Sequence, residues 1–234
     1  MPAEALLEVR DLCIELIPHR GILRGVSFDI PTGTIAGLSG DSGSGKTTLA
    51  LALLKLLLPA RYHVGGQVLL RGRDVLALDE RALESVRGAQ IAMIFQDPLQ
   101  ALNPVLPIRR QIGEILRAHH AEGDPAELLE MAGIAMPERV LGAYPHELSG
   151  GERQRATIAQ ALACRPALIV ADEPFTALDA PRVVELAGLF RRLRDRLGTS
   201  FLVISHNPGT LRITADQLLV LRDGTLAKGE AYAR

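Results

Sequence analysis

The stretch GDSGSGKTT, residues 40–48, decides the fold of this 234-residue chain. It satisfies the pattern G-x-x-x-x-G-K-[ST], follows the apolar segment TIAGLSG and opens an apolar segment with helical character. Glycines in such a loop let backbone N–H groups surround phosphate oxygens without Cβ clashes. Lys46 is expected to reach the β- and γ-phosphates, and the Thr47 hydroxyl to ligate Mg²⁺. The stretch predicts a nucleoside triphosphate site made of Gly40, Asp41, Ser42, Gly43, Ser44, Gly45, Lys46, Thr47 and Thr48.

The composition is that of an ordinary globular protein, with 47% hydrophobic and 23% charged residues. The net charge of −1 neither requires nor excludes nucleic acid. Aromatic residues make up only 3% of the chain, which leaves little for stacking on bases, and we expect no nucleic-acid partner. Cys13 and Cys164 are far apart and form no C-x-x-C pair, which predicts buried free thiols in a reducing compartment.

Nothing in the sequence predicts a membrane span or a secretion signal. The start MPAEALLEVRD lacks a basic region followed by a long apolar stretch. The most apolar run, LALALLKLLLPA (49–60), contains Lys55 and is too short to cross a bilayer, so it is expected to form a buried helix. If the protein works at a membrane, another chain must supply the spanning part.

Apolar strands alternate with helices, which predicts an α/β fold with a mostly parallel sheet. Residues 6–16 and 25–30 indicate two antiparallel strands with a turn near 18–21, and residues 98–165 are mostly helical in pattern. An amphipathic helix is expected over 181–197, ended by Gly198. Further strands are expected at QVLLRG, IAMIF, ALIVA and FLVIS, with a closing hairpin of QLLVL and TLAKG (225–229).

The segment ALIVADEP is expected to supply the acidic partner of the glycine loop. A buried strand ending in Asp172 and Glu173 places two carboxylates at the carboxyl edge of the sheet, where ligands bind in open α/β folds. Asp172 suits Mg²⁺, and Glu173 is placed to orient or deprotonate an attacking water. Taken alone, such a run is more often a strand that simply meets solvent. The presence of the glycine loop favours a catalytic and metal-binding role for these two carboxylates over that alternative.

Gln96 and His206 each follow a predicted strand in the same manner. Gln96 is expected to contact Mg²⁺ or water, and His206 to hydrogen-bond the γ-phosphate. A surface glutamine and a structural histidine are the ordinary alternatives for residues in these positions.

The stretch YPHELSGGERQR (144–155) predicts a second helix start suited to an anion. Ser149, Gly150 and Gly151 precede a polar helical segment, whose first N–H groups and positive dipole end would be free. One chain would therefore carry two phosphate-like helix starts about a hundred residues apart.

Together these segments resemble the ATP-binding subunits of ABC transporters. GDSGSGKTT, Gln96, LSGGE, ALIVADEP, the ALD ending at Asp179 and His206 occur in that family's order and spacing, over residues 6–229. The resemblance implies one ABC ATPase domain over 1–234 with a RecA-like core. Residues 1–96 and 166–234 would form the nucleotide-binding core with its N-terminal antiparallel β subdomain, and residues 97–165 an inserted helical subdomain bearing the signature.

The resemblance also implies roles for these residues in binding ATP and Mg²⁺. Glu173 would be the catalytic base, His206 the switch and Gln96 the γ-phosphate sensor near the metal that Thr47 and Asp172 hold. The signature residues, listed with the glutamate that follows them, would cap the ATP of a facing subunit: Ser149, Gly150, Gly151 and Glu152. Asp179 would lie in a loop communicating across the dimer.

QDPLQALNP (96–104) and the signature stretch narrow the resemblance to the peptide and nickel importer branch. This implies a peripheral subunit on the cytoplasmic face of the inner membrane. Its partners would be transmembrane permeases, a second ATP-binding subunit, identical or paralogous, and indirectly an extracytoplasmic binding protein. Cargo stays open between nickel or another metal chelate and short peptides. The short chain favours the nickel-type subunit, and the lack of a cysteine cluster predicts no iron–sulfur centre.

Two departures from the family pattern matter. The family usually places an aromatic residue against the adenine, but LIPHRG (16–21) has none, which leaves Ile17 or His19 as candidates and base selectivity open. SHNPG also replaces a frequent His-Asp pairing and leaves the role of Asn207 open.

Two rival functions follow from the same motifs. A soluble ABC protein acting on ribosomes or DNA usually carries paired modules or a coiled-coil insertion, and no heptad run is present here. A plain P-loop kinase or GTPase does not need LSGG. Co-purification with a permease separates the first rival, and nucleotide-dependent dimerisation the second.

Overall fold

The structure, a computed structural model, describes residues 5–18 and 20–227. Its N-terminal part is a four-stranded antiparallel sheet with the order β2-β1-β4-β5. The strands are β1 (Ala5–Leu16), β2 (Arg20–Pro31), β4 (Tyr62–Leu70) and β5 (Arg73–Asp74). The expected antiparallel pair is confirmed, but β2 begins earlier than predicted, so Arg20 and Gly21 belong to a strand and not to the turn.

A six-stranded sheet with the order β10-β9-β3-β8-β7-β6 forms the centre of the molecule. Its strands are β3 (Ile35–Ser39), β6 (Ile91–Ile94), β7 (Leu168–Asp172), β8 (Ser200–Ile204), β9 (Gln217–Arg222) and β10 (Thr225–Ala227). All neighbouring pairs are parallel except β9 and β10, which form the predicted closing hairpin. The last predicted residues of that hairpin, Lys228 and Gly229, lie outside the described residues.

Alternate residues of the central strands pack into two different cores. On β7, Leu168 and Val170 belong to the core shared with the antiparallel sheet and α1 (Lys46–Leu53), whereas Ile169 and Ala171 belong to the core shared with the helices. Both faces are therefore apolar, as expected for a parallel strand covered on each side. Only the strand ends remain for polar chemistry, and Asp172 is the last residue of β7.

The leucine run that follows the glycine loop is only partly helical. The predicted helix over 49–60 ends at Leu53, and that expectation is wrong beyond this point. Lys55 takes a positive φ of 51°, and its Nζ donates to the carbonyl of Leu78 at 2.6 Å. The chain turns there, so Leu58 is 61% exposed rather than buried.

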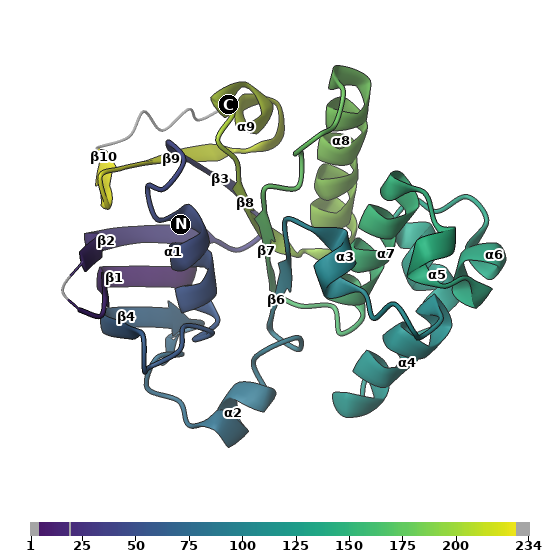
Figure 1. The fold of residues 1–234 in the computed structure, drawn as a ribbon, viewed down its shortest axis with the longest axis horizontal. Helices are drawn as coiled ribbons and strands as arrows, with labels where there is room; N and C mark the ends of the chain where they lie inside the picture. Colours follow the sequence, from purple (N-terminus) through teal and green to yellow (C-terminus); the bar gives the residue numbers. More distant parts are fainter. Residues whose placement is uncertain (1–4, 19, 228–234) are drawn as a thin grey trace.

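The segment after β6 is helical, as predicted. It contains α3 (Pro98–Ala101), α4 (Ile108–Ala118), α5 (Pro125–Met131), α6 (Pro137–Gly142), the 3₁₀ turn Pro145–Glu147 and α7 (Gly150–Leu162). Several of these elements begin with proline, which lacks the N–H that the first turn leaves unpaired and has its φ preset. The prolines thus separate short helices. Figure 1 shows this segment beside the central sheet, on the side away from the antiparallel sheet.

Helix α8 (Ala180–Leu197) confirms the predicted amphipathic helix. Leu186, Phe190 and Leu193 are buried in the second core, and Gly198 ends the helix with a φ of 70°. Three short elements were not predicted: β5, α2 (Glu80–Glu84) and α9 (Pro208–Thr214). In residues 5–18 and 20–227, no helix is long and apolar enough to cross a membrane.

The cysteines are free, but the prediction that they are buried is wrong. Cys13 is exposed and Cys164 is half-buried. Cys13 lies on β1 of the antiparallel sheet, and its sulfur accepts a hydrogen bond from the Gly25 N–H at 3.2 Å.

Candidate active site

The carboxyl ends of β3, β6, β7 and β8 meet at one edge of the central sheet, because these four strands run parallel and adjacent. A cleft of about 890 Å³ opens there, lined by residues 41–48, Gln96, Glu173 and His206 among others. Four segments far apart in the sequence are thus brought together. The structure joins the glycine loop, the glutamine, the acidic strand end and the histidine in one cleft.

The glycine loop begins α1, as predicted. Gly45 is the residue before the helix and has a φ of 103°, a conformation that a side chain would strain. A Cβ on Gly40 would lie 2.3 Å from the backbone oxygen of Leu221, so the start of the loop also requires glycine. The hydroxyl of Ser44 is buried and has no hydrogen-bond partner in the described structure. An unsatisfied donor inside a glycine cradle fits a phosphate oxygen.

Lys46 is held inside its own loop. Its Nζ donates to the backbone oxygens of Gly40 at 2.8 Å and Asp41 at 2.9 Å. The side chain is only 7% exposed, so its charge is kept at the centre of the loop. A phosphate entering the cradle would meet an ammonium group that is already positioned.

Asp172 is 3% exposed, and its Oδ1 has no hydrogen-bond partner in the described part of the chain. Burial raises the pKa of this carboxyl above its ordinary value; a hydrogen bond with Thr47 opposes that rise, Glu173 adds to it, and Lys46 opposes it. A buried orphan oxygen costs about 1–3 kcal/mol unless a ligand satisfies it. The oxygen donors of Asp172 and Thr47 fit Mg²⁺, which prefers carboxylate and hydroxyl oxygens.

Glu173 is paired with His206. The Nδ1 of His206 lies 3.0 Å from each carboxylate oxygen, and its backbone N–H donates to Oε1 at 2.9 Å. An ionised carboxylate only accepts, so Nδ1 carries the proton in this arrangement. Glu173 also has a φ of 50°, a region that costs a non-glycine residue about 1–3 kcal/mol. Strain and pairing together fix the direction of this carboxylate.

Gln96 lies two residues beyond the end of β6 and lines the cleft. It is exposed, and no described contact engages its amide. Its predicted roles toward Mg²⁺ and the γ-phosphate stay predictions.

The other end of the cleft was not identified from the sequence. Its lining includes Leu16, Arg20, Gly21, Ile22, Arg24, Asp223 and Gly224. The N–H of Arg24 donates to the Gly224 oxygen at 2.8 Å, which joins β2 to the turn between β9 and β10. Of the two candidates for the adenine contact, Ile17 does not line the cleft, and His19 lies outside the described residues. The sequence did carry a signal for this part of the cleft. Leu16 and Ile22 are apolar residues on either side of the predicted turn, and the side chains of a strand alternate between its two faces.

The signature stretch forms a capped helix start. Ser149 precedes α7, its Oγ accepts from the Glu152 N–H at 3.3 Å, and Oε2 of Glu152 accepts from the Ser149 N–H at 2.9 Å. Glu152 is also paired with Arg139 of α6. A Cβ built on Gly150 or Gly151 would meet no atom within 4 Å, so both glycines face open space.

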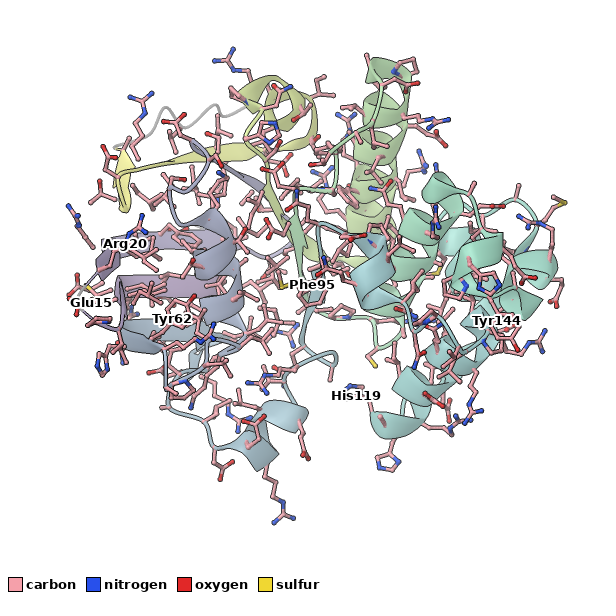
Figure 2. All side chains as sticks on the ribbon, in the orientation of Figure 1. Glu15, Arg20, Tyr62, Phe95, His119 and Tyr144 are labelled. Carbon is pink, nitrogen blue, oxygen red and sulfur yellow. The ribbon has the colours of Figure 1, made fainter. Side chains whose placement is uncertain are left out.

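A second hollow of about 570 Å³ lies over this helix start. It is lined by Ser149, Gly150, Gly151 and Glu152, with residues of the 133–136 turn and of α8. Among the described residues, its lining shares no member with that of the nucleotide cleft. Figure 2 shows Arg20 near the edge of the antiparallel sheet and Tyr144, close to the signature, on the helical side. The two phosphate-like helix starts therefore open into different hollows.

Asp179 and Asn207 both cap helices. The Asp179 carboxylate accepts from the Arg182 N–H at 3.1 Å at the start of α8. The Asn207 side chain accepts from the Gly209 N–H at 2.9 Å at the start of α9, which gives this residue the role left open by the sequence. The predicted role of Asp179 across a dimer stays a prediction.

Comparison with known proteins gives a consistent picture. The ABC transporter family matches residues 23–176. The peptidoglycan transport ATP-binding protein YejF of Agrobacterium fabrum is 47% identical over 237 residues, covering 96% of this chain and 43% of that protein. The oligopeptide transport ATP-binding protein OppD of Bacillus subtilis is 40% identical over 233 residues, covering 95% of this chain and 65% of that protein. The chain thus spans less than two thirds of the length of these relatives.

Solved structures resemble the fold closely. The dimeric structure of MJ0796, described as a bacterial ABC transporter cassette, has a TM-score of 0.84 at 26% identity, covering 97% of this chain and 99% of that chain. The dimeric post-hydrolysis state of the same ATP-binding cassette, bound to ADP and Pi, has a TM-score of 0.83 at 26% identity, with the same coverage of both chains.

Proposed function

The chain belongs to the ABC transporter family as an ATP-binding cassette, and we propose that it hydrolyses ATP as one half of a nucleotide-sandwich dimer that drives an importer. One observation carries this proposal: the phosphate loop and the signature helix start open into two separate hollows of one chain. Neither hollow is lined by both the phosphate loop and the signature helix start. A second chain, turned to face the first, would bring a signature over each cleft.

The residues of the cleft fit a hydrolysis that depends on position and charge. Lys46 would exchange the carbonyls of Gly40 and Asp41 for the β- and γ-phosphate oxygens, and Thr47 and Asp172 would hold the metal. Magnesium bound with the nucleotide neutralises charge that develops on the transferred phosphoryl group. Lys46 already lies inside the loop that would hold the phosphates, so it needs only to exchange its two carbonyl partners.

Glu173 would take the proton of the attacking water. As the water oxygen bonds to the γ-phosphorus, the bond from that phosphorus to the β–γ bridging oxygen breaks, and ADP leaves with the electron pair. The proton remains on Glu173 until it passes to phosphate or solvent. His206 holds the carboxylate through Nδ1. In the imidazolium form, with a proton on Nε2 as well, Nε2 would donate to a γ-phosphate oxygen.

Mixing two defective variants tests whether the signature acts across chains. Lys46→Ala disables the cleft of its own chain, and Ser149→Ala disables the cap that the chain offers to its partner. A mixed dimer would put both defects in one site and leave the other intact. We expect an equimolar mixture to recover up to about a quarter of the wild-type ATPase rate, since half of the random dimers hold one intact site. A rate equal to the mean of the separate variants would reject capping across chains.

We propose a peripheral position on the cytoplasmic face of the inner membrane, with transmembrane permeases and, indirectly, an extracytoplasmic binding protein as partners. The names of YejF and OppD refer to peptidoglycan and oligopeptide transport, which favours a peptide-like cargo over the nickel suggested by chain length. No observation favours action on ribosomes or DNA. Co-purification with a permease pair, followed by ATPase stimulation by candidate peptides or by nickel, tests both the partner and the cargo.

We further propose that the nucleobase lies at the end of the cleft lined by Leu16, Ile22, Arg20 and Arg24. No phenylalanine, tyrosine or tryptophan lines the described part of this cleft. The aliphatic side chains offer an apolar wall, and a guanidinium can lie over any base as a cation on a π face. Such a site has few groups that read the exocyclic atoms of adenine.

Base selectivity is therefore expected to be weak. ATP and GTP should compete with a fluorescent ATP analogue with dissociation constants within about fivefold, because one extra contact gives roughly 1 kcal/mol. Arg24→Ala should weaken both nucleotides by about two- to fivefold, the equivalent of roughly 0.5–1 kcal/mol. Arg81→Ala, an exposed arginine on α2, is the matched control. A preference for ATP above about fiftyfold would contradict this arrangement.

A further inference from the structure

A side chain of the signature helix reaches the loop that carries the proposed base. Nε2 of Gln154, on α7, donates a hydrogen bond to the backbone oxygen of Pro174 at 2.5 Å. Pro174 directly follows Glu173. The bond therefore links α7, which begins directly after Ser149, to the peptide next to the carboxylate of the proposed base.

The hydrogen bond from Gln154 satisfies the backbone carbonyl of Pro174. The residue is buried, and Gln154 is the partner that the described hydrogen bonds assign to its oxygen. On either side of Pro174 the loop is fixed by other contacts: the Glu173 N–H donates to the Ile204 oxygen at 3.0 Å, and Phe175 packs 6.2 Å from Phe190, between ring centroids. A buried carbonyl that loses its partner is costly, so the strained turn at Glu173 would shift without Gln154.

The bond also connects residues that belong to the two different hollows. Gln154 lines the hollow over the signature, and Glu173 lines the nucleotide cleft. Helix α7 is firmly held near this point, because Arg155 donates to the Ala132 oxygen at 2.9 Å and is paired with Glu185 of α8. Ser149 lies five residues before Gln154, about 7.5 Å along the same helix. A movement at the helix start would therefore reach Pro174 through a rigid element.

We propose that Gln154 is a positioning residue that couples the signature of a chain to the Glu173 of that same chain. This inference rests on the proposed sandwich, in which Ser149 serves the partner's ATP while Glu173 serves its own. Contact of Ser149 with the partner's γ-phosphate would fix the position of α7. Gln154 would then hold the backbone at Pro174, and with it the Glu173 carboxylate, in the reactive position. The two ATP sites would be coupled through one hydrogen bond inside each chain.

The test compares two isosteric substitutions on one helix. Gln154→Glu removes the donor to Pro174, while Gln160→Glu makes the same change at a glutamine that donates to Gln111 instead, at 3.2 Å. For Gln154→Glu we expect kcat to fall at least about tenfold, KM for ATP to stay within about twofold, and the Hill coefficient for ATP to fall from above one to one. Gln160→Glu should keep kcat and the Hill coefficient within about twofold of wild type.

The uncharged pair Gln154→Met and Gln160→Met repeats the test without a new carboxylate. A merely structural role would lower the melting temperature and weaken ATP binding, rather than change kcat and the Hill coefficient alone. Equal effects at positions 154 and 160, a loss of kcat that follows the fall in melting temperature, or a wild-type Hill coefficient of one would overturn the coupling role.

The outcome also separates this inference from the proposed function. If wild-type turnover depends on Glu173 but Gln154→Glu behaves like Gln160→Glu, only the coupling is rejected. If the wild-type protein binds ATP without hydrolysing it, and Glu173→Gln changes nothing, the proposed function and the coupling both fall.

Discussion

Replacing Glu173 by glutamine is expected to lower the steady-state rate of ATP hydrolysis by at least about a hundredfold, because a positioned general base contributes roughly 10²–10⁴ to such a rate. The variant should still bind ATP. Lys46, Thr47 and the glycine loop, which hold the phosphates, are untouched by the change. An amide has the shape of the carboxylate and can keep a hydrogen bond with His206, but it cannot take the proton from water.

The same substitution should trap a dimer. If ATP closes two chains and hydrolysis reopens them, a chain that binds without hydrolysing remains closed. Size-exclusion chromatography with ATP should give a dimer for Glu173→Gln and mostly monomer for the wild-type protein after turnover. Glu84→Gln, at an exposed glutamate on α2, is the matched control and should behave as wild type. ATPase activity of Glu173→Gln near the wild-type rate would remove Glu173 from the base role.

Lys46→Ala is expected to cause the largest loss of nucleotide affinity. The Nζ group is buried and would face the β- and γ-phosphates, and removing one partner of a buried charged pair costs about 2–5 kcal/mol. That range corresponds to a loss of roughly thirtyfold or more in the dissociation constant. Equilibrium titration with a fluorescent ATP analogue measures it directly.

The control for Lys46→Ala is Lys55→Ala, nine residues further along. Lys55 also donates to a backbone oxygen, that of Leu78, but it does not line the cleft. Both variants lose a lysine and its bonds to backbone oxygens, so a shared effect on stability cancels in the comparison. Equal ATP affinity in the two variants would contradict the role of Lys46 in holding phosphate.

Much of the cleft was predictable because its parts carry strong local signals. The glycine loop needs glycine at Gly40 and Gly45 for reasons of backbone space, and Asp172 ends a strand whose other residues are all apolar. Parallel strands place their carboxyl ends at one edge of the sheet, so the proximity of Gln96, Glu173 and His206 could be predicted from the sequence. The pairing of Glu173 with His206 was not foreseen, because it depends on a strained φ that no sequence pattern encodes.

The base end of the cleft could not be predicted for a different reason. Arg24 and Gly224 are about two hundred residues apart, and they meet only because the β9–β10 hairpin packs against β2. The helix expected over the leucine run was predicted too long, because an apolar run does not reveal that the chain turns out of the helix at Lys55. The contact of Gln154 with Pro174 likewise joins two segments whose proximity is set by packing alone.

The open space above Gly150 and Gly151 has an evolutionary consequence. Nothing in the folded chain asks for glycine at these first two positions of α7, and alanine has a higher helix propensity than glycine. A single chain judged only by its own stability would therefore drift away from this pair. If the pair is kept for a partner's nucleotide, selection on the assembled transporter works against selection on the isolated subunit, and the subunit retains a small, permanent instability for the sake of the assembly.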